Sequence, residues 1–366
     1  MKFDIERQRL LSALQPVVGV VERRQTMPVL SNFLLETDNG SLLVTGTDLE
    51  LELLASAEAS VHESGRAAVP ARKLYDICRG LPDEAHVSCE LADQKLHIRS
   101  GRSRFTLSTL AATDFPVVDD IGETNRINLE KQTLERLLHK TQFAMAHQDV
   151  RYYLNGLLLV LRADRLRAVA TDGHRLALCD APQSIETEHE QQLIIPRKAV
   201  AELQKLLGDE VETIPLELGS NHLRAQIGAV RLTTKLIDGR FPDYERVIPE
   251  DGNKLLSGNR QGMRQALART AILSNEKFRG VRLELSTERL RLQAQNPDHE
   301  EAQEDIDGSY EGAPIDIGFN VNYLLDALAV LDGEEFTLSL SSPDSSGLIR
   351  DGSDPHCRYV VMPMRL

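Results

Sequence analysis

Apolar residues recur at helical spacing in six stretches of the chain. Leu203, Leu206 and Leu207 show this spacing in one stretch, and Leu324 and Leu328 show it in another. Positions i, i+3, i+4 and i+7 share one face of an α-helix, so each stretch is predicted to form a helix with one buried face. The predicted helical segments are residues 6–18, 69–82, 129–146, 195–209, 260–273 and 319–333, and those that start at 69, 195 and 319 open with the end of a strand.

Strand patterns fill the intervals between the helices. Residues 165–171 (RLRAVAT) and 290–296 (LRLQAQN) alternate or run apolar, as half-buried strands do. The turn signals Asp-Asn-Gly at 38–40 and Asp-Gly-His at 172–174 separate neighbouring strands. Short turns join antiparallel neighbours, so we predict an α+β fold with antiparallel sheets.

The whole pattern repeats three times. Thr47-Asp48 and Thr171-Asp172 lie 124 residues apart, and Gln295-Asn296 follows after another 124 residues. Each third of the chain opens with a helix, carries a second helix at a similar offset, and closes with TLAATDFPVVDD, KLIDGRFPDYERVIP or YVVMPMRL. One such repeat cannot bury both faces of its sheets, so neighbouring repeats are expected to pack edge to edge. We predict three similar domains, residues 1–124, 125–250 and 251–366, each with two helices packed on antiparallel sheets.

The segment Asp172-Gly173-His174-Arg175 raises the question of catalysis. An Asp beside a His could act as a general base or bind a metal. The other two repeats have TDLE and QNPD at this position, without the His, and Asp-Gly is favoured in tight turns that need a positive φ. The chain has no nucleophile elbow, HExxH, Walker A or GxGxxG motif. We therefore predict a turn and a protein that is not an enzyme, with no cofactor and no metal; a metal-dependent nuclease using Asp172 and His174 is the alternative.

The composition is that of a soluble globular protein with more than one core. The chain has 366 residues, of which 41% are apolar and 27% charged. We find neither a signal-peptide pattern at the N-terminus nor an apolar run near the roughly 18 residues that span a bilayer, so we expect a cytoplasmic protein without membrane contact. Four cysteines form no metal-binding pattern and are expected to be reduced, mostly buried thiols: Cys78, Cys89, Cys179 and Cys357.

Charge is distributed unevenly between the helices and the rest of the chain. Charge was counted over the six segments 6–24, 71–80, 129–141, 197–207, 259–270 and 319–331, which contain most of each predicted helix. Five of the six are net positive, and together they carry +9, which leaves −23 on the rest of a chain whose net charge is −14. The last helix differs, since it has no Lys or Arg and contains Asp326. The bias favours a basic helix face that meets phosphates without reading bases, although solvated helix faces alone could produce it. After the second repeat's first helix, hydrogen-bonding and aromatic groups cluster at Gln148, Arg151, Tyr152 and Tyr153, which could equally begin a strand.

Several long motifs occur in one order along the whole chain. They include TMPVLSNFLLE, TGTDLE, SGRSRFTLSTL, MAHQDVRYYLNG, VATDGHRLA, KLIDGRFPDYERVIP, AILSNEKFRGVRL, IGFNVNYLLDAL and the terminal YVVMPMRL. In these motifs the chain resembles the bacterial DNA polymerase III beta subunits, the sliding clamps.

The resemblance implies a head-to-tail homodimeric ring with helices inside and sheets outside, which encircles duplex DNA without sequence specificity and makes polymerases processive. The implied partners are the clamp loader complex, the DNA polymerase III alpha subunit, other DNA polymerases, and repair and replication-initiation regulators that carry clamp-binding peptides. A duplicate clamp copy that confers resistance to a clamp-binding antibiotic is the alternative within the family. A sequence-specific DNA binder is a further alternative, but we find no helix motif with base-reading side chains.

The resemblance also assigns residues to three sites. The implied DNA contacts are Arg24, Arg72, Gln148, Tyr152 and Tyr153. The implied dimer interface joins a basic strand, with Phe105 and Leu107 on its other face, to Ile272, Leu273 and an acidic run of the partner: Arg102, Arg104, Phe105, Leu107, Ile272, Leu273, Glu300, Glu301 and Glu304. The implied peptide pocket is an adaptable apolar cleft with a few polar groups, formed by Leu154, Thr171, Gly173, His174, Arg175, Leu176, Pro242, Arg246, Val247, Ser346, Val360, Val361, Met362, Pro363 and Met364. From the residues alone, MPM near the C-terminus favours core packing.

Overall fold

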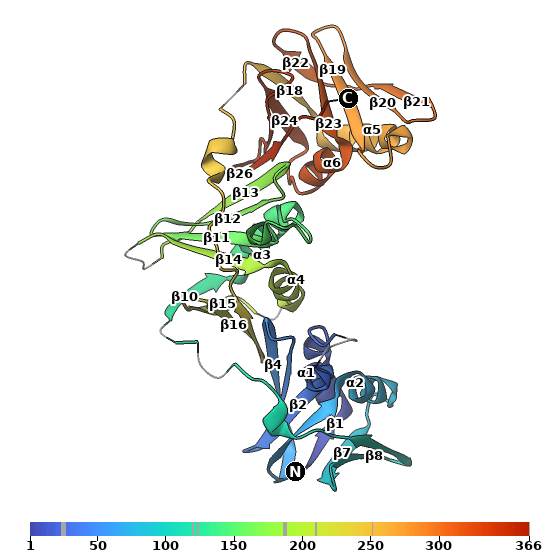
Figure 1. Ribbon diagram of the computed structural model, residues 1–366, viewed down its shortest axis with the longest axis vertical. Helices are drawn as coiled ribbons and strands as arrows, with labels where there is room; N and C mark the ends of the chain where they lie inside the picture. The colour runs from blue at the N-terminus through green and yellow to red at the C-terminus, as the bar shows by residue number, and fades with distance from the viewer. Residues whose placement is uncertain are drawn as a thin grey trace. The chain divides into compact units, whose positions relative to one another are not determined.

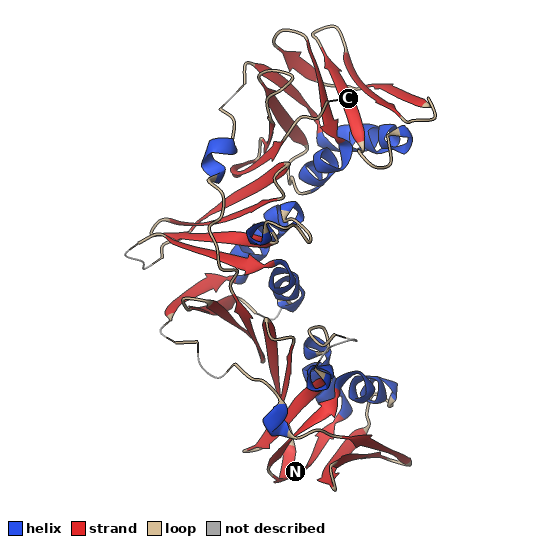
Figure 2. Ribbon diagram, in the orientation of Figure 1, coloured by secondary structure: helices blue, strands red, loops and turns tan. Residues whose placement is uncertain are grey.

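The computed structural model describes residues 1–22, 27–118, 121–122, 124–185, 189–208, 211–250 and 252–365. Within these ranges all six predicted helices are present, and antiparallel strands make up the sheets (Figure 2). The helices are α1 (Arg7–Val17), α2 (Ala71–Gly80), α3 (Lys131–Thr141), α4 (Arg197–Leu206), α5 (Arg260–Thr270) and α6 (Val321–Ala329). Single 3-10 turns lie at Pro28–Ser31, Ala112–Asp114, Gln142–Ala144, Tyr152–Leu154, Tyr244–Val247 and Ala271–Leu273.

Helices α2, α4 and α6 each begin directly after a strand, as the sequence predicts. In α6 the buried residues are Val321, Leu324, Ala327 and Leu328, which lie three and four residues apart and form one face of the helix. Asn320 caps this helix, since its side chain accepts a hydrogen bond from the amide of Asn322. The local pattern and the cap therefore agree on where α6 starts.

The chain divides into two compact units, and α3 and α4 each have residues in both. The first unit comprises Met1–Gln132 and Lys198–Leu236. It contains an eight-stranded sheet in the order β10 (Asn125–Glu130), β15 (Thr213–Leu218), β16 (His222–Ile227), β17 (Val230–Lys235), β4 (Leu51–Glu58), β3 (Ser41–Thr47), β2 (Asn32–Asp38), β6 (Gly65–Pro70). Its second sheet has the order β5 (Ser60–Glu63), β1 (Lys2–Glu6), β7 (His86–Ala92), β8 (Lys95–Ser100), β9 (Ser103–Ser108).

The second unit comprises Thr133–Arg197 and Ile237–Leu366. Its nine-stranded sheet has the order β14 (Gln191–Pro196), β11 (Gly156–Arg162), β12 (Arg165–Thr171), β13 (Arg175–Pro182), β26 (Asp354–Val361), β25 (Gly347–Asp351), β24 (Glu335–Leu340), β18 (Lys254–Asn259), β22 (Ser309–Glu311). The four-stranded sheet has the order β21 (Glu301–Asp305), β20 (Leu290–Gln295), β19 (Gly280–Leu285), β23 (Ile315–Asn320). Helices α5 and α6 pack against each other in this unit (Figure 1).

Two strand pairs join predicted repeats edge to edge. Strand β17 of the second repeat pairs with β4 of the first, and β13 of the second repeat pairs with β26 of the third. Each pair continues one sheet across a predicted repeat boundary, so sheet edges that a single repeat would leave open are closed. The two compact units consequently cut through the second repeat.

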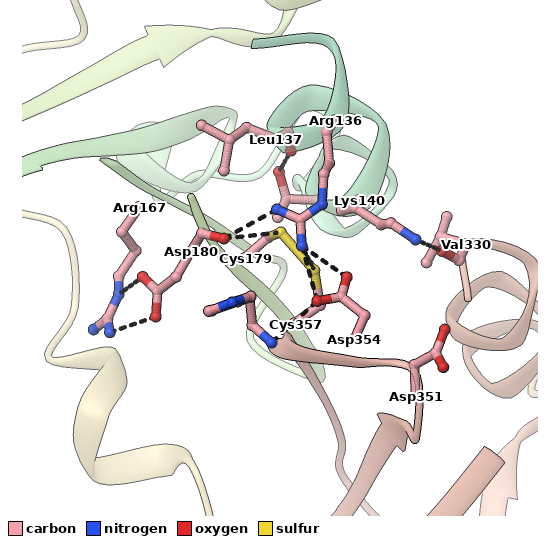
Figure 3. Close-up of a disulfide and its surroundings, with 12 residues drawn as sticks. Arg136, Leu137, Lys140, Arg167, Cys179, Asp180, Val330, Asp351, Asp354 and Cys357 are labelled. Carbon is pink, nitrogen blue, oxygen red and sulfur yellow. Dashed lines mark hydrogen bonds and ion pairs between the residues drawn. A yellow bond between two sulfur atoms is a disulfide. The ribbon is translucent and has the colours of Figure 1, made fainter. Parts of the chain in front are cut away.

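The cysteine prediction is wrong for two of the four residues. Cys179 on β13 and Cys357 on β26 lie opposite each other in the strand register and form a disulfide (Figure 3). Cys78 and Cys89 are free and buried, as predicted. The paired cysteines are 178 residues apart in the sequence. Only the pairing of β13 with β26 brings them together, and no local spacing could reveal it.

Candidate functional site

The Asp172-Gly173 turn is formed largely by the side chains of its own residues. Gly173 has φ 87°, which is the left-handed conformation that the sequence predicts for this turn. One carboxylate oxygen of Asp172 accepts hydrogen bonds from the amides of His174 (2.9 Å) and Arg175 (3.0 Å). The hydroxyl of Thr171 donates to the carbonyl of Arg175 (2.6 Å) and accepts from the amide of Gly173 (3.1 Å). The turn prediction is therefore confirmed, and Asp172 is occupied by the backbone of its own turn.

The same turn occurs one repeat earlier, at residues 47–51. The Asp48 carboxylate accepts from the amides of Glu50 (3.0 Å) and Leu51 (2.7 Å), and Thr47 bonds to the backbone as Thr171 does. Leu49 has φ 80°, in the position of Gly173. The repeat seen in the sequence is thus a repeat of hydrogen-bonding geometry.

Arg175 is held on several sides by protein groups. Its Nε donates to the second oxygen of Asp172 (3.1 Å), its Nη1 to Asp326 of α6 (2.5 Å) and its Nη2 to the carbonyl of Phe143 (2.6 Å). The guanidinium carbon lies 4.6 Å from the ring centroid of Tyr323 and 5.3 Å from that of Phe143. Only 13% of the side chain is exposed. We predicted from the resemblance that Arg175 lines a pocket, and within the chain its guanidinium bonds to Asp172, Asp326 and Phe143.

Three of the predicted pocket residues belong to a buried apolar cluster. Leu154, Leu176 and Val360 are at most 4% exposed and pack in one cluster with Phe241 and Tyr244. They can form the floor of a site but present little surface of their own. Thr171 and Val361 are also buried, at 8% and 1% exposure.

The exposed predicted pocket residues surround this cluster. The amide of Met362 donates to the carbonyl of His174 (2.9 Å), which ties the C-terminal segment to the turn. Both side chains are exposed, and Pro363 and Met364 are half-buried. Ser346 is also half-buried and precedes Gly347, which is paired with Val361 in the sheet register. One end of the β13–β26–β25 ladder therefore carries polar and apolar side chains beside an apolar floor.

A third side of the predicted site comes from the 3-10 turn at Tyr244–Val247. Tyr244 and the preceding Phe241 anchor this segment in the buried cluster. Pro242 and Val247 remain exposed, Val247 at 41%. Arg246 is exposed and pairs with Asp243 (2.7 Å), two groups that remain within reach of solvent.

Four of the five predicted DNA contacts lie within the described residues; Arg24 lies outside them. Gln148 and Tyr152 are exposed, and Tyr153 is half-buried with its ring edge-on to Tyr152 at 5.8 Å. Arg72 is exposed on α2, and its Nη2 donates to the carbonyl of Val21 (3.2 Å). These side chains are available for phosphates.

Part of the positive charge counted on the helices is paired with acidic side chains of the same chain. Arg136 of α3 donates to both carboxylate oxygens of Asp354 (2.7 and 2.9 Å) (Figure 3). The buried Lys140 pairs with Asp332 (2.8 Å). Lys198 of α4 pairs with Asp48 and with Glu22. Burial opposes the charge of Lys198, but the two carboxylates outweigh burial and raise its pKa. These three cations hold elements together and are committed to acids of the chain.

The predicted dimer-interface residues lie on two outer strands, directly before these strands, and in the 3-10 turn after α5. Strands β9 and β21 each lie at the end of their sheet order. Arg104 and Phe105 lie on opposite faces of β9, whereas Arg102, which we placed on the strand, lies in the turn before it. Leu107 is already buried within the chain, at 8% exposure.

The other half of the predicted interface surrounds an exposed apolar side chain. Ile272 is 75% exposed in the turn after α5, and this turn contacts β21. Leu273 is half-buried. Glu304 is already paired with Arg269, Glu300 accepts from the side-chain amide of Asn296 (2.6 Å), and Glu301 is exposed.

Sequence reasoning missed two features of the second unit. A cavity of about 470 Å³ is lined by Phe278, Arg282, Gln293 and Met364 among others, and no local motif indicated it. Asp326 was noticed only as an unexpected acid on the last helix, and its partner Arg175 is 151 residues away.

The described part of the chain has no group of three or more His, Cys, Asp or Glu side chains that could hold a metal ion. In the same residues no helix combines the length and the apolar character needed to cross a membrane. The site around the turn offers backbone groups, an apolar floor and fixed charges. Such a set of groups is suited to binding a chain segment.

Comparisons with known proteins cover the chain from end to end. Models of the DNA polymerase III beta subunit match in order: the N-terminal domain over residues 1–119, the central domain over residues 128–243 and the C-terminal domain over residues 245–365. The chain is 53% identical to the beta sliding clamp of Pseudomonas putida over 367 residues, covering 100% of both proteins. The crystal structure of the DNA polymerase III subunit beta from Pseudomonas aeruginosa matches with a TM-score of 0.97 and 49% identity, again over 100% of both chains. A sliding clamp from the same organism, solved bound to griselimycin, matches with a TM-score of 0.95 and 50% identity over 100% of both chains.

The three family models follow one another in the same order as the repeats found in the sequence. Identity of about half over the full length is far above what similarity of fold alone requires. The family also accounts for the absence of catalytic motifs in the sequence, since its members are non-catalytic processivity subunits. The chain belongs to the DNA polymerase III beta subunit family, the beta sliding clamps.

Proposed function

We propose that two copies of this chain join head to tail into a closed ring that encircles duplex DNA and tethers DNA polymerases to it. The observation that carries the proposal is the tandem match of three clamp domains over the full length of the chain. Residues 1–124, 125–250 and 251–366 would be the three domains of each subunit. With six helices in the described part of each chain, twelve helices would line the hole.

The proposed ring continues the sheet pairing already present within the chain. Strands β4 with β17, and β13 with β26, join neighbouring repeats inside one chain. Strand β9 of one copy and β21 of the other would form the third kind of joint. Phe105 would meet Ile272 and Leu273 there, while Arg104 would face Glu301.

A ring suits this task because affinity alone is too weak. Non-specific binding to DNA typically has a Kd of about 10⁻⁴ to 10⁻⁶ M and weakens steeply with salt. A closed ring cannot dissociate from a long duplex without opening, so its inner surface can bind weakly and slide. Arg24, Arg72, Gln148, Tyr152 and Tyr153 are the proposed phosphate and backbone contacts.

The proposed peptide site lies at the end of the β13–β26 ladder. Its floor is the buried cluster of Leu154, Leu176 and Val360, and its exposed edges carry His174 and Met362. A partner segment with aliphatic and aromatic anchors could bury those anchors against the floor and bond to the polar edges. Such segments would come from the polymerase III alpha subunit, other polymerases, the clamp loader, and repair or initiation regulators. We place the protein in the cytoplasm, where DNA is replicated in bacteria.

The relatives named above are beta sliding clamps, and the alternative of a duplicate copy that confers antibiotic resistance has no separate support. The P. aeruginosa clamp solved with griselimycin binds that compound. A site for such a compound on the present chain is part of the peptide-site proposal.

Topological linkage is the decisive test of the proposed ring. The protein would be loaded onto nicked circular DNA with a cognate clamp loader and ATP, in moderately high salt, and the circle would then be cut once. We expect retention on the circle and loss from the cut DNA, because a ring can slide off only at an end. Equal retention on both forms would mean ordinary binding and would rule out the ring mechanism for this chain.

A further inference from the structure

Asp326 is the one acidic residue on α6, a helix that has no Lys or Arg. In a ring whose helices face DNA, an acid there is unfavourable unless it has another task. Its carboxylate accepts a hydrogen bond from Nη1 of Arg175, and about half of the side chain is exposed. Asp326 is not among the residues proposed to contact a peptide, and its bond to Arg175 links it to the proposed peptide site.

The contacts of Arg175 connect α6 to the Asp172-Gly173 turn. Nη1 of Arg175 holds Asp326, and its Nε holds one carboxylate oxygen of Asp172. The other oxygen of Asp172 holds the amides of His174 and Arg175. The carbonyl of His174 in turn accepts from the amide of Met362. One chain of bonds therefore runs from α6 through the turn to the C-terminal segment.

The guanidinium of Arg175 is bonded mainly to groups of its own chain. Its guanidinium donates to two carboxylates and a carbonyl, and aromatic rings of Tyr323 and Phe143 lie near it. With 13% of its side chain exposed, it has little surface left for a partner. Arg175 is suited to fix the position of the turn relative to α6.

The equivalent turn in the first repeat supports this assignment independently. There Oδ1 of Asp48 accepts the turn amides, and Oδ2 accepts a hydrogen bond from Nζ of Lys198, in the first turn of α4. In both repeats the turn aspartate is tied, through a cation, to the second helix of the next repeat. Between the first and second repeats the cation is Lys198 of the helix α4. Between the second and third repeats the cation is Arg175 of the turn, and the helix α6 supplies the acid Asp326.

We propose that Asp326 is a positioning residue for the peptide site: through Arg175 it fixes the 171–175 turn, and through His174 the segment at Met362. The inference rests on the proposed peptide-binding function, and it gives Arg175 a positioning role within that site. Asp326 sets the affinity for peptides without touching them.

The test compares Asp326→Asn with Asp332→Asn. Asp332 is a matched control because it is also an exposed acid that pairs with a cation of the preceding repeat, Lys140 at 2.8 Å, and its pairing lies away from the turn. Two quantities are measured on the full-length protein: hydrogen exchange of the amides at 173–175, and the Kd of a fluorescent hexapeptide with Leu and Phe anchors. We expect Asp326→Asn to speed exchange at these amides and to raise the Kd by about tenfold, the effect of weakening one charge-assisted hydrogen bond. Asp332→Asn should change neither.

A double variant separates positioning from direct contact. If Asp326 acts through Arg175, adding Asp326→Asn to Arg175→Met should raise the Kd no further. Additive effects would overturn the proposal, and so would faster exchange with an unchanged Kd or a raised Kd with unchanged exchange. If the wild-type protein does not bind the peptide, the proposed peptide site fails, while unchanged exchange in Asp326→Asn would still refute the positioning role.

Discussion

At the scale of single residues, the burial of a group decides its chemistry. Cys78 and Cys89 are both 1% exposed. Burial raises the pKa of Cys78 to about 11, although Arg7 acts in the opposite direction, and burial raises the pKa of Cys89 to about 12. The charged thiolate is the reactive form, so both side chains are held in their inert form.

Thiol labelling before and after unfolding tests the burial of Cys78 and Cys89 and the disulfide between Cys179 and Cys357. At pH 8 a thiol with a pKa near 11 is ionised in only about one molecule in a thousand, so we expect iodoacetamide to label neither Cys78 nor Cys89 in the folded protein. In denaturant without reductant, mass spectrometry should find two labelled cysteines, and after reduction four. Rapid labelling of Cys78 or Cys89 in the folded protein at pH 8 would contradict the burial, and four labels without reductant would contradict the disulfide.

At the scale of helices and strands, a basic side chain can pair with an acid of the chain or remain exposed to solvent. Counting Lys and Arg residues in the sequence does not separate these two roles. Arg72 and Lys198 hold matching positions, since each is the second residue of a helix that begins directly after a strand. Lys198 is committed to Asp48 and Glu22, whereas Arg72 donates to a backbone carbonyl. Equivalent cations in two repeats therefore differ in use: Lys198 holds an internal ion pair, whereas Arg72 remains exposed on its helix.

The salt dependence of DNA binding should distinguish the two cations. Replacing Arg72 with Ala should lower the slope of log K against log salt by roughly one for each phosphate that its side chain neutralises. Replacing Lys198 with Ala should leave that slope unchanged and lower thermal stability, because Asp48, 8% exposed at its side chain, loses its cation. Anisotropy titrations of a linear duplex at several salt concentrations give both slopes. An equal decrease of slope in the two variants would show that Lys198 also meets phosphates.

At the scale of the whole molecule, the proposed dimer depends on an apolar side chain that the single chain leaves uncovered. Ile272 is 75% exposed beside strand β21. Val150, in the proposed DNA-contact loop, is 95% exposed. A single exposed apolar side chain does not by itself mark an interface, and of these two only Ile272 is assigned to the subunit joint.

Replacing Ile272 with Asp should therefore yield monomers, because an unpaired carboxylate would be buried in the joint. Val150→Asp is the matched control and should remain a dimer. Sedimentation velocity over a range of protein concentrations measures both. A dimer of unchanged stability in Ile272→Asp would place the subunit joint elsewhere on the chain.

Much of the architecture could be predicted from the sequence because it depends on local periodicity. The six helices follow from apolar spacing, as at Leu324 and Leu328, and the three repeats follow from a period of 124 residues. The Asp172-Gly173 turn was predictable for the same reason. Gly tolerates its positive φ and the Asp side chain satisfies its amides, and both properties belong to adjacent residues.

Tertiary structure alone decided which residues from distant segments contact each other. The disulfide of Cys179 with Cys357 depends on the pairing of β13 with β26, and the bond of Arg175 to Asp326 depends on where α6 packs. The commitment of Arg136, Lys140 and Lys198 to internal acids is invisible in a charge count. Local sequence determines backbone conformation and which face of an element is apolar. Which groups meet across the chain is set by strand pairing and helix packing, since these bring together residues that no short-range pattern connects.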